Sequence, residues 1–128
     1  MKLLLDTHVW LWYVLGDTQL SQTHRHLLED PGAELYLSSI SVWEAHLLIE
    51  KKRLHVDQPP GVWVPRAVRT MQLREVGITF AIAVRSRAIA VEHQDPADRF
   101  IAATAVELKM PLLTEDDRLM RCSEIRCL

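Results

Sequence analysis

The sequence predicts an α/β fold in which helices cover both faces of a central parallel sheet of four to five strands. Short apolar runs that suit buried strands recur along the chain, and each is followed by a segment with apolar residues at helical spacing. Strand-then-helix order favours a parallel sheet, because parallel strands need a crossover connection. A length of 128 residues, with 48% hydrophobic and 25% charged residues, fits one domain with one core, over residues 1–128.

Five short segments have the character of strands that are buried on both faces. Each is a brief apolar run next to turn residues or a charged residue, as where Leu3-Leu4-Leu5 meets Asp6. The expected strands are residues 2–6, 35–38, 75–79, 111–114 and 124–127.

Seven segments carry apolar residues three and four positions apart, as one face of a helix requires. Pro31-Gly32 and Pro59-Pro60-Gly61 are strong breaks between elements. Ser21 is a candidate cap for the second helix. The expected helices are residues 7–15, 21–29, 41–53, 61–71, 80–91, 96–109 and 116–121.

Four acidic residues fall where a parallel sheet places its ligands, beyond the carboxyl ends of the strands. They are Asp6 at the end of the first strand, Glu44 in the first turn of the helix after the second strand, Asp98 in the first turn of the helix 96–109, and Asp116 after the fourth strand. Helix capping is an alternative explanation for each acid taken singly. The cap patterns are Ser41-x-x-Glu44, Asp95-Pro96 with Asp98 in the third helical position, and Thr114-x-x-Asp117.

The four acids together have an explanation that caps do not supply. If they converge, one like-charged pair near 4 Å costs about 4 kcal/mol at an effective dielectric of 20, and a bound divalent cation removes that repulsion. Carboxylates without His or Cys partners suit Mg²⁺ or Mn²⁺ better than zinc. Such cations clamp a phosphate, activate water and stabilise the leaving oxygen. The cluster therefore predicts phosphodiester hydrolysis.

The same segments resemble the PIN-domain ribonucleases, specifically the VapC-type toxins of type II toxin–antitoxin pairs. The matching segments follow the family order: Leu3-Leu4-Leu5-Asp6-Thr7-His8, Ser39-Ile40-Ser41-Val42-Trp43-Glu44, His93-Gln94-Asp95-Pro96-Ala97-Asp98-Arg99-Phe100-Ile101-Ala102-Ala103 and Leu112-Leu113-Thr114-Glu115-Asp116. The resemblance implies a PIN-like α/β/α sandwich and an endoribonuclease that depends on Mg²⁺ or Mn²⁺.

The resemblance also implies a role for each acid. Asp6 and Asp98 would be the principal metal ligands, Glu44 would bind metal or orient the attacking water, and Asp116 would complete the site. Asp95 lies close to Asp98 in the chain, and either could be the direct ligand. The family further implies homodimers and a tight complex with a small antitoxin protein, through which alone the chain would reach DNA.

Several polar residues next to the acids are candidates for a supporting role. Thr7 and Thr114 could hydrogen-bond the carboxylates or a phosphate, or cap helices. Arg99 could hold Asp95, contact RNA phosphate, or form a surface ion pair. Two histidines, His8 and His93, lie near the expected site, but the acids suffice for metal binding.

Four tryptophans and one basic run have more than one explanation. Trp10, Trp12, Trp43 and Trp63 are expected in the core or at interfaces, with base stacking as an alternative. The run Lys51-Lys52-Arg53 either ends a helix favourably or contacts phosphate.

Charge and cysteine content limit the function further. The net charge is −2, so RNA binding must depend on a local basic patch, on metal ions or on a partner. No apolar run approaches the roughly 18 residues of a membrane span. Cys122 and Cys127 match no zinc motif and are expected to be reduced. We expect a cytoplasmic protein.

Two alternatives to an antitoxin-controlled ribonuclease stay open from the sequence. One is a nuclease that matures RNA or processes DNA without an antitoxin. The other is a non-catalytic binding module that keeps the fold, against which the presence of all four acids argues.

Overall fold

The computed structural model describes residues 1–92 and 95–128, and its strands form one parallel sheet in the order β3-β2-β1-β4. The strands are β1 (Lys2–Leu5), β2 (Glu34–Ser38), β3 (Arg74–Val76) and β4 (Leu112–Leu113). The helices are α1 (Thr7–Leu15), α2 (Gln22–Glu29), α3 (Ser39–Glu50), α4 (Pro60–Thr70), α5 (Phe80–Ala88), α6 (Pro96–Leu108) and α7 (Asp117–Met120). The predicted α/β class with a parallel sheet is confirmed.

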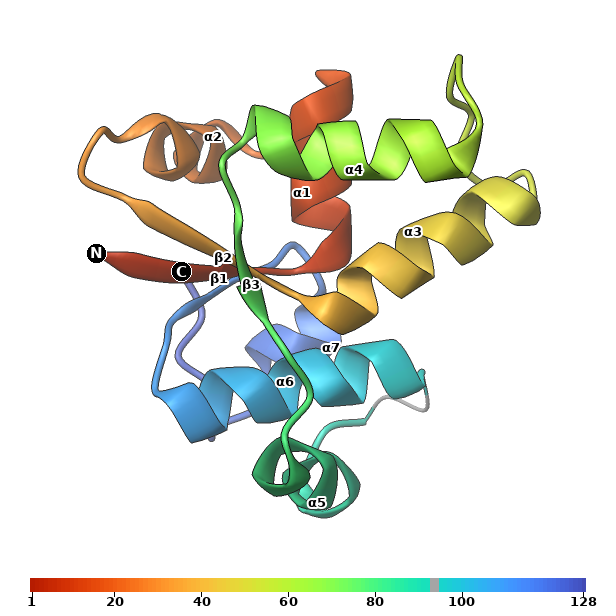
Figure 1. Cartoon of the computed structure of the whole chain (residues 1–128). Coiled ribbons are helices and arrows are strands. Elements are labelled where there is room, and N and C mark those ends of the chain that lie inside the picture. The colour runs from red at the N-terminus through yellow and green to blue at the C-terminus, as the bar shows by residue number, and fades with distance from the viewer. Residues whose placement is uncertain (93–94) are drawn as a thin grey trace.

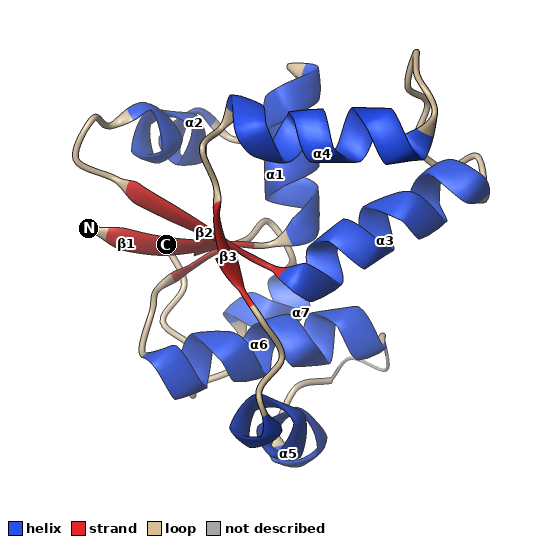
Figure 2. Ribbon diagram, viewed as in Figure 1, coloured by secondary structure: helices blue, strands red, loops and turns tan. Residues whose placement is uncertain are grey.

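Both faces of the sheet are covered, and the alternation of side chains along β1 explains how. Leu3 and Leu5 point into a core shared with α1, α2, α3 and α4, whereas Leu4 points into a second core shared with α6 and α7. Figure 1 shows α1, α2 and α4 on one side of the sheet and α5, α6 and α7 on the other. Figure 2 shows the sheet edge-on between these helix layers. None of the helices in the described residues is long and apolar enough to cross a membrane.

The strand order creates a switch point between β1 and β4. The chain builds β1, β2 and β3 outward in one direction and then returns to place β4 on the other side of β1. The Asp6 backbone amide donates to the Leu113 carbonyl at 2.9 Å, which extends the pairing of β1 and β4 up to the acid. Ligands of open parallel sheets bind where the order reverses. Asp6 and Asp116 therefore follow the two strands that flank this crevice.

Two predicted helix caps are wrong, and in both cases another polar residue nearby takes the position. Ser38 caps α3 by accepting from the Ile40 amide, so Ser41 and Glu44 lie inside the helix and form no capping box. Asp116, and not Thr114, caps α7 by accepting from the Arg118 amide. The predicted Ser21 cap of α2 and the Asp95 cap of α6 are confirmed.

The third and fifth predicted strands differ most from the expected lengths. The strand expected over 75–79 is β3, which ends at Val76, since Thr79 caps α5 by accepting from the Ile82 amide. The strand expected over 124–127 is a single parallel bridge between Leu112 and Cys127. The sheet therefore has four strands.

Arg99 fixes the segment that leads out of α5. Its Nε donates to the Ser86 carbonyl at 2.8 Å, its Nη2 to the Ile89 carbonyl at 2.9 Å, and its Nη1 to the Val91 carbonyl at 3.1 Å. These carbonyls lie at or beyond the helix end, where the backbone lacks helical partners. The guanidinium therefore ends α5 at Ala88, three residues earlier than predicted, and ties it to α6.

Replacement of Arg99 by methionine should destabilise the fold by about 2–4 kcal/mol, because it leaves carbonyls without their charged donor. Urea denaturation measures this loss as the free energy of unfolding. Arg87→Met is the matched control, since Arg87 is an exposed residue near the end of α5. Equal losses of unfolding free energy in the two variants would contradict the stabilising role of the Arg99 hydrogen bonds.

Candidate active site

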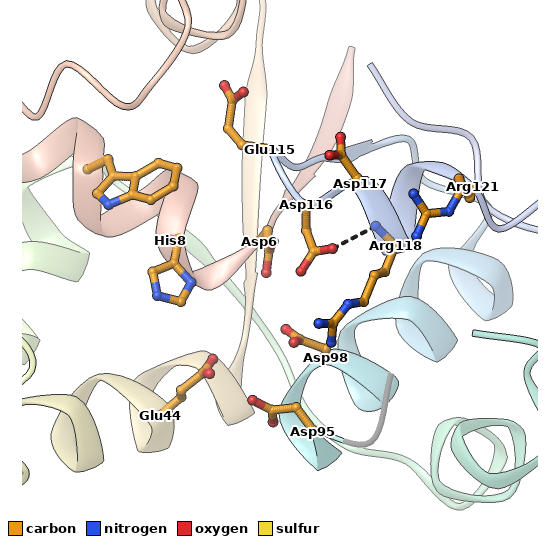
Figure 3. Close-up of a pocket in the computed structure, with 11 residues that line it drawn as sticks. Asp6, His8, Glu44, Asp95, Asp98, Glu115, Asp116, Asp117, Arg118 and Arg121 are labelled. Atoms are coloured by element: carbon orange, nitrogen blue, oxygen red, sulfur yellow. Dashed lines mark hydrogen bonds between the residues drawn. The ribbon is translucent and has the colours of Figure 1, made fainter. Parts of the chain in front are cut away.

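The four predicted acids line one pocket of about 660 Å³ beyond the carboxyl ends of β1 and β4. Asp95 lines it as well, and in Figure 3 the five carboxylates point toward a common space. The other lining residues are His8, Trp12, Glu115, Asp117, Arg118 and Arg121. Residues that are far apart in the sequence therefore come together. One position differs from the prediction: Glu44 was expected in the first turn of its helix and lies in the second.

Both carboxylate oxygens of Asp6 accept hydrogen bonds. Asp6 is buried, with an exposed fraction of 4%, and caps α1 by accepting from the Thr7 amide at 2.8 Å. Its second carboxylate oxygen accepts from the Thr114 hydroxyl at 2.7 Å. Burial raises the pKa of Asp6, against the opposing effects of the Thr114 hydrogen bond and of His8. Both oxygens are thus held in place at the switch point.

Glu44 enters the pocket from the second turn of α3. A hydrogen bond of 2.8 Å from the Thr7 hydroxyl to Ser41 joins α1 to α3 one turn before it. Burial raises the pKa of Glu44, with nearby Asp95 and Asp6 adding to the shift. Among the described residues, no hydrogen-bond partner reaches its buried Oε1 atom. A buried oxygen of this kind needs a ligand to be stable.

Asp98 is surrounded by the negative charge of the other carboxylates. It lies in the first turn of α6, as predicted, two residues after Pro96. Burial and the surrounding carboxylates raise the pKa of Asp98 to about 8; the carboxylates, in order of effect, are Asp6, Asp95, Glu44 and Asp116. Strongly perturbed acids of this kind mark functional sites.

Asp116 and the residues after it form the remaining wall. Its carboxylate accepts from the Arg118 amide at 2.8 Å, the bond drawn in Figure 3, and its own amide donates to the Thr114 hydroxyl at 3.0 Å. Arg118 and Arg121 bring positive charge to the rim of the pocket. Sequence reasoning missed these arginines. Their three-residue spacing directly after Asp116 was the available signal, because it places them on one face of a helix.

The supporting residues have different positions. Thr7 and Thr114 donate hydrogen bonds within the site, and Asp95 caps α6 through a bond of 2.9 Å from the Ala97 amide while lining the pocket. Arg99 uses its guanidinium on main-chain carbonyls between α5 and α6. His8 lines the pocket, whereas His93 lies outside the described residues.

The chemistry of the pocket suits a hard divalent cation. Within residues 1–92 and 95–128, no three His, Cys, Asp or Glu side chains as they stand could hold a metal ion, and the acids line an open pocket. The donors are nonetheless carboxylate oxygens, which Mg²⁺ and Mn²⁺ prefer. The buried Glu44 Oε1 atom, which no described residue reaches with a hydrogen bond, also fits a cation site. The residues present thus fit such an ion.

Comparison with known proteins identifies the family to which this fold belongs. The profile of the PIN domain family matches residues 3–124. The chain belongs to the PIN domain family. This PIN domain is 35% identical over 117 residues to Ribonuclease VapC22 of Mycobacterium tuberculosis (strain H37Rv), covering 91% of this chain and 88% of that protein.

Solved structures share the fold of this PIN domain at lower identity. The crystal structure of VapBC2 from Rickettsia felis, bound to a promoter DNA fragment, has a TM-score of 0.72 at 13% identity and covers 100% of this chain and 98% of that chain. DNA-bound VapBC from Salmonella typhimurium has a TM-score of 0.68 at 18% identity, with 100% and 97% covered. FitAcB from Neisseria gonorrhoeae has a TM-score of 0.67 at 23% identity, with 98% and 96% covered.

Without metal, the protein should lose stability as the pH rises from about 4 to about 8. The pKa of Asp98 rises from 3.8 to about 8 on folding, so the folded state binds more protons than the unfolded state across this window. Its contribution is favourable at low pH and is lost as the acid ionises. Asp98→Asn should flatten this dependence and raise the melting temperature at about pH 8, by about 4 °C for each kcal/mol of repulsion removed.

The measurement is thermal denaturation in EDTA over this pH range. Glu50→Gln is the matched control, since Glu50 is exposed at the end of α3. A pH dependence in Asp98→Asn as steep as that of the parent protein would rule out Asp98 as its source.

Proposed function

We propose that this PIN domain is a metal-dependent endoribonuclease of the VapC type that hydrolyses RNA phosphodiester bonds. The observation that carries the proposal is the convergence of Asp6, Glu44, Asp98 and Asp116 on one pocket at the sheet switch point. The identity to Ribonuclease VapC22 supports the choice of RNA as substrate. The crowded acids are unfavourable for the empty fold, so their convergence points to a ligand of opposite charge.

Each side chain has a defined task in this proposal. Asp6 and Asp98 would hold Mg²⁺ or Mn²⁺, Glu44 would bind the ion or orient the attacking water, and Asp116 would complete the site. Such an ion, when bound, neutralises phosphate charge and lowers the pKa of water. Thr114 and Thr7 would keep the Asp6 carboxylate oriented through the bonds that they donate.

Substrate binding would use the cations at the rim. The chain has a net charge of −2, so phosphate contacts must be local. Arg118 and Arg121 line the pocket from α7 and its C-terminal end and are exposed. We propose that they contact phosphates that flank the cleaved bond, since arginine binds phosphate in a bidentate manner.

The proposed function includes protein partners. The likeness to VapBC complexes supports a small antitoxin as a partner. We propose that this antitoxin inhibits the enzyme and that DNA is bound through the antitoxin alone, since the net charge of this chain is −2. We propose a homodimer as well, because Phe80 and Val84 on α5 are 94% and 72% exposed and lie one helical turn apart. The protein would act in the cytoplasm, where its RNA substrate is found.

Cleavage of single-stranded RNA should require Mg²⁺ or Mn²⁺ and should stop in EDTA. Asp6→Asn and Asp98→Asn should each lower kcat/KM by more than about 100-fold, because loss of a ligand should cost at least as much as loss of an outer-shell partner. The measurement is the rate of cleavage of a labelled RNA, with Glu50→Gln as control. Full activity in either Asn variant would refute the assignment, and equal cleavage of DNA would favour a nuclease with another task.

Binding of Mn²⁺ should raise the melting temperature, because an ion that binds only the folded state stabilises it. At a concentration of about 100 times Kd, the gain is about 2.7 kcal/mol. Differential scanning fluorimetry measures it, and Asp98→Asn should lose most of the gain. An unchanged melting temperature at saturating Mn²⁺ would favour a non-catalytic module.

A further inference from the structure

A second cavity of about 390 Å³ lies next to the acidic pocket. The two share four lining residues: His8, Trp12, Glu44 and Asp95. A group bound in the second cavity would therefore lie directly beside whatever occupies the acidic pocket. The site described above does not explain this cavity.

An aromatic pair from α1 forms the boundary between the two cavities. His8 and Trp12 lie one helical turn apart, with ring centroids separated by 5.5 Å and planes inclined by 49°. Trp12 is half-buried and His8 is exposed, so both rings can be reached from the cavity. Trp10 differs from them, since it is fully buried and donates its Nε1 proton to the Ala67 carbonyl at 3.3 Å. Core packing therefore accounts for Trp10, whereas Trp12 packs against the same core but is only half-buried and lines both cavities.

The rest of the cavity combines an apolar wall with polar groups at its edge. Leu11, Leu48 and Leu54 supply the apolar wall. Gln19 and Arg53 also line the cavity and are exposed. This combination suits a flat ligand that is apolar on its faces and carries hydrogen-bonding groups on its edges.

We propose that this cavity binds one unpaired nucleobase of the RNA, next to the scissile phosphate, and so selects the cleavage sequence. The inference rests on the ribonuclease function proposed above. The base stacks on the Trp12 ring, between the apolar wall and His8. Arg53 and Gln19 contact the edge of the base. Proteins read single-stranded RNA in this way, through aromatic stacking and hydrogen bonds to base edges.

A nucleobase fits the cavity better than an apolar side chain of a protein partner. An apolar side chain makes no hydrogen bond with the Arg53 guanidinium or with Gln19, whose Nε2 donates to Asp17 at 3.3 Å at the edge of the cavity. The edge of a base offers acceptors and donors to such groups, and the base remains joined to a phosphate that can reach the adjoining acidic pocket.

The test first maps the wild-type cleavage site in the presence of Mn²⁺. It then compares kcat/KM for short single-stranded RNAs that differ only in the nucleotide on either side of that site, including one abasic nucleotide at each position. The wild-type protein should prefer particular bases on one side by about tenfold or more, and the abasic RNA should lose a similar factor. Trp12→Leu should reduce the difference in kcat/KM between the bases. On the abasic RNA, its kcat/KM should equal that of the wild-type protein.

Tyr13→Leu is the matched control, because Tyr13 packs against the same core from the next position of α1 and lines neither cavity. It should keep the wild-type preference. Trp12→Phe should restore much of it, and Arg53→Gln should change the preferred base while leaving the melting temperature unchanged. If Trp12→Leu does not fold, Trp12→Phe, Arg53→Gln and the abasic RNAs decide the question.

An unchanged base preference in Trp12→Leu and Arg53→Gln would overturn the inference, as would equal cleavage of abasic and intact RNA by the wild-type protein. Variants that cleave with the wild-type preference but escape inhibition by the co-expressed neighbouring gene product would assign the cavity to a protein partner, and would overturn it too. If the wild-type protein cleaves no RNA with any divalent metal, the proposed function itself fails. If the wild-type protein cleaves RNA without base preference, the proposed role of the second cavity fails and the proposed ribonuclease function stands.

Discussion

The hydrogen bonds that hold the buried Asp6 carboxylate are the constraint on which the site depends. One oxygen accepts from the Thr7 amide and the other from the Thr114 hydroxyl. The first bond starts α1 and the second joins the ends of β1 and β4. Because Asp6 is fixed to both strands at the switch point, the acids from α3, α6 and α7 can be positioned around it by ordinary helix packing.

This arrangement opposes stability, and the rest of the fold compensates for it. Asp6, Glu44 and Asp98 all have raised pKa values, with burial as the largest cause in each case. The compensation lies beneath them, where Leu4 and Leu5 enter separate cores on the two faces of the sheet. Functional sites commonly carry such local conflict, because the same charges that disfavour the empty fold favour the bound ligand.

The features of the fold that the sequence predicts correctly are those that local residue patterns determine. Apolar runs followed by helical periodicity were enough for the class and for the parallel sheet. The Asp95-Pro96 pair, with Asp98 two residues later, placed one acid correctly on α6 because capping is a local interaction. Asp6 could be placed from the abrupt end of an apolar strand.

What the sequence did not predict depends on contacts between distant segments. Ser41 matched a capping box, but Thr7, which lies 34 positions away, engages its hydroxyl inside the helix. Thr114 matched both a helix cap and a partner of the site carboxylates, and only the fold selects the second, since Thr114 donates to Asp6 across 108 positions. Arg99 resembled an ion-pair residue, and only the path of the chain after α5 gives it three carbonyls. Local patterns offer several partners to a polar side chain, and the tertiary fold decides among them.

Helix α1 connects the chemistry of the site to the selection of substrate proposed here. Its N-cap is Asp6, and Trp12 follows six positions later, which is about 9 Å along a helix axis at 1.5 Å per residue. His8 and Trp12 share one face, while Val9, Trp10 and Leu11 are buried. A carboxylate and an aromatic ring on one packed helix cannot move independently. The distance between the proposed metal-binding end and the proposed base-binding ring is therefore set by the fold, as accurate placement of a cleavage site would require.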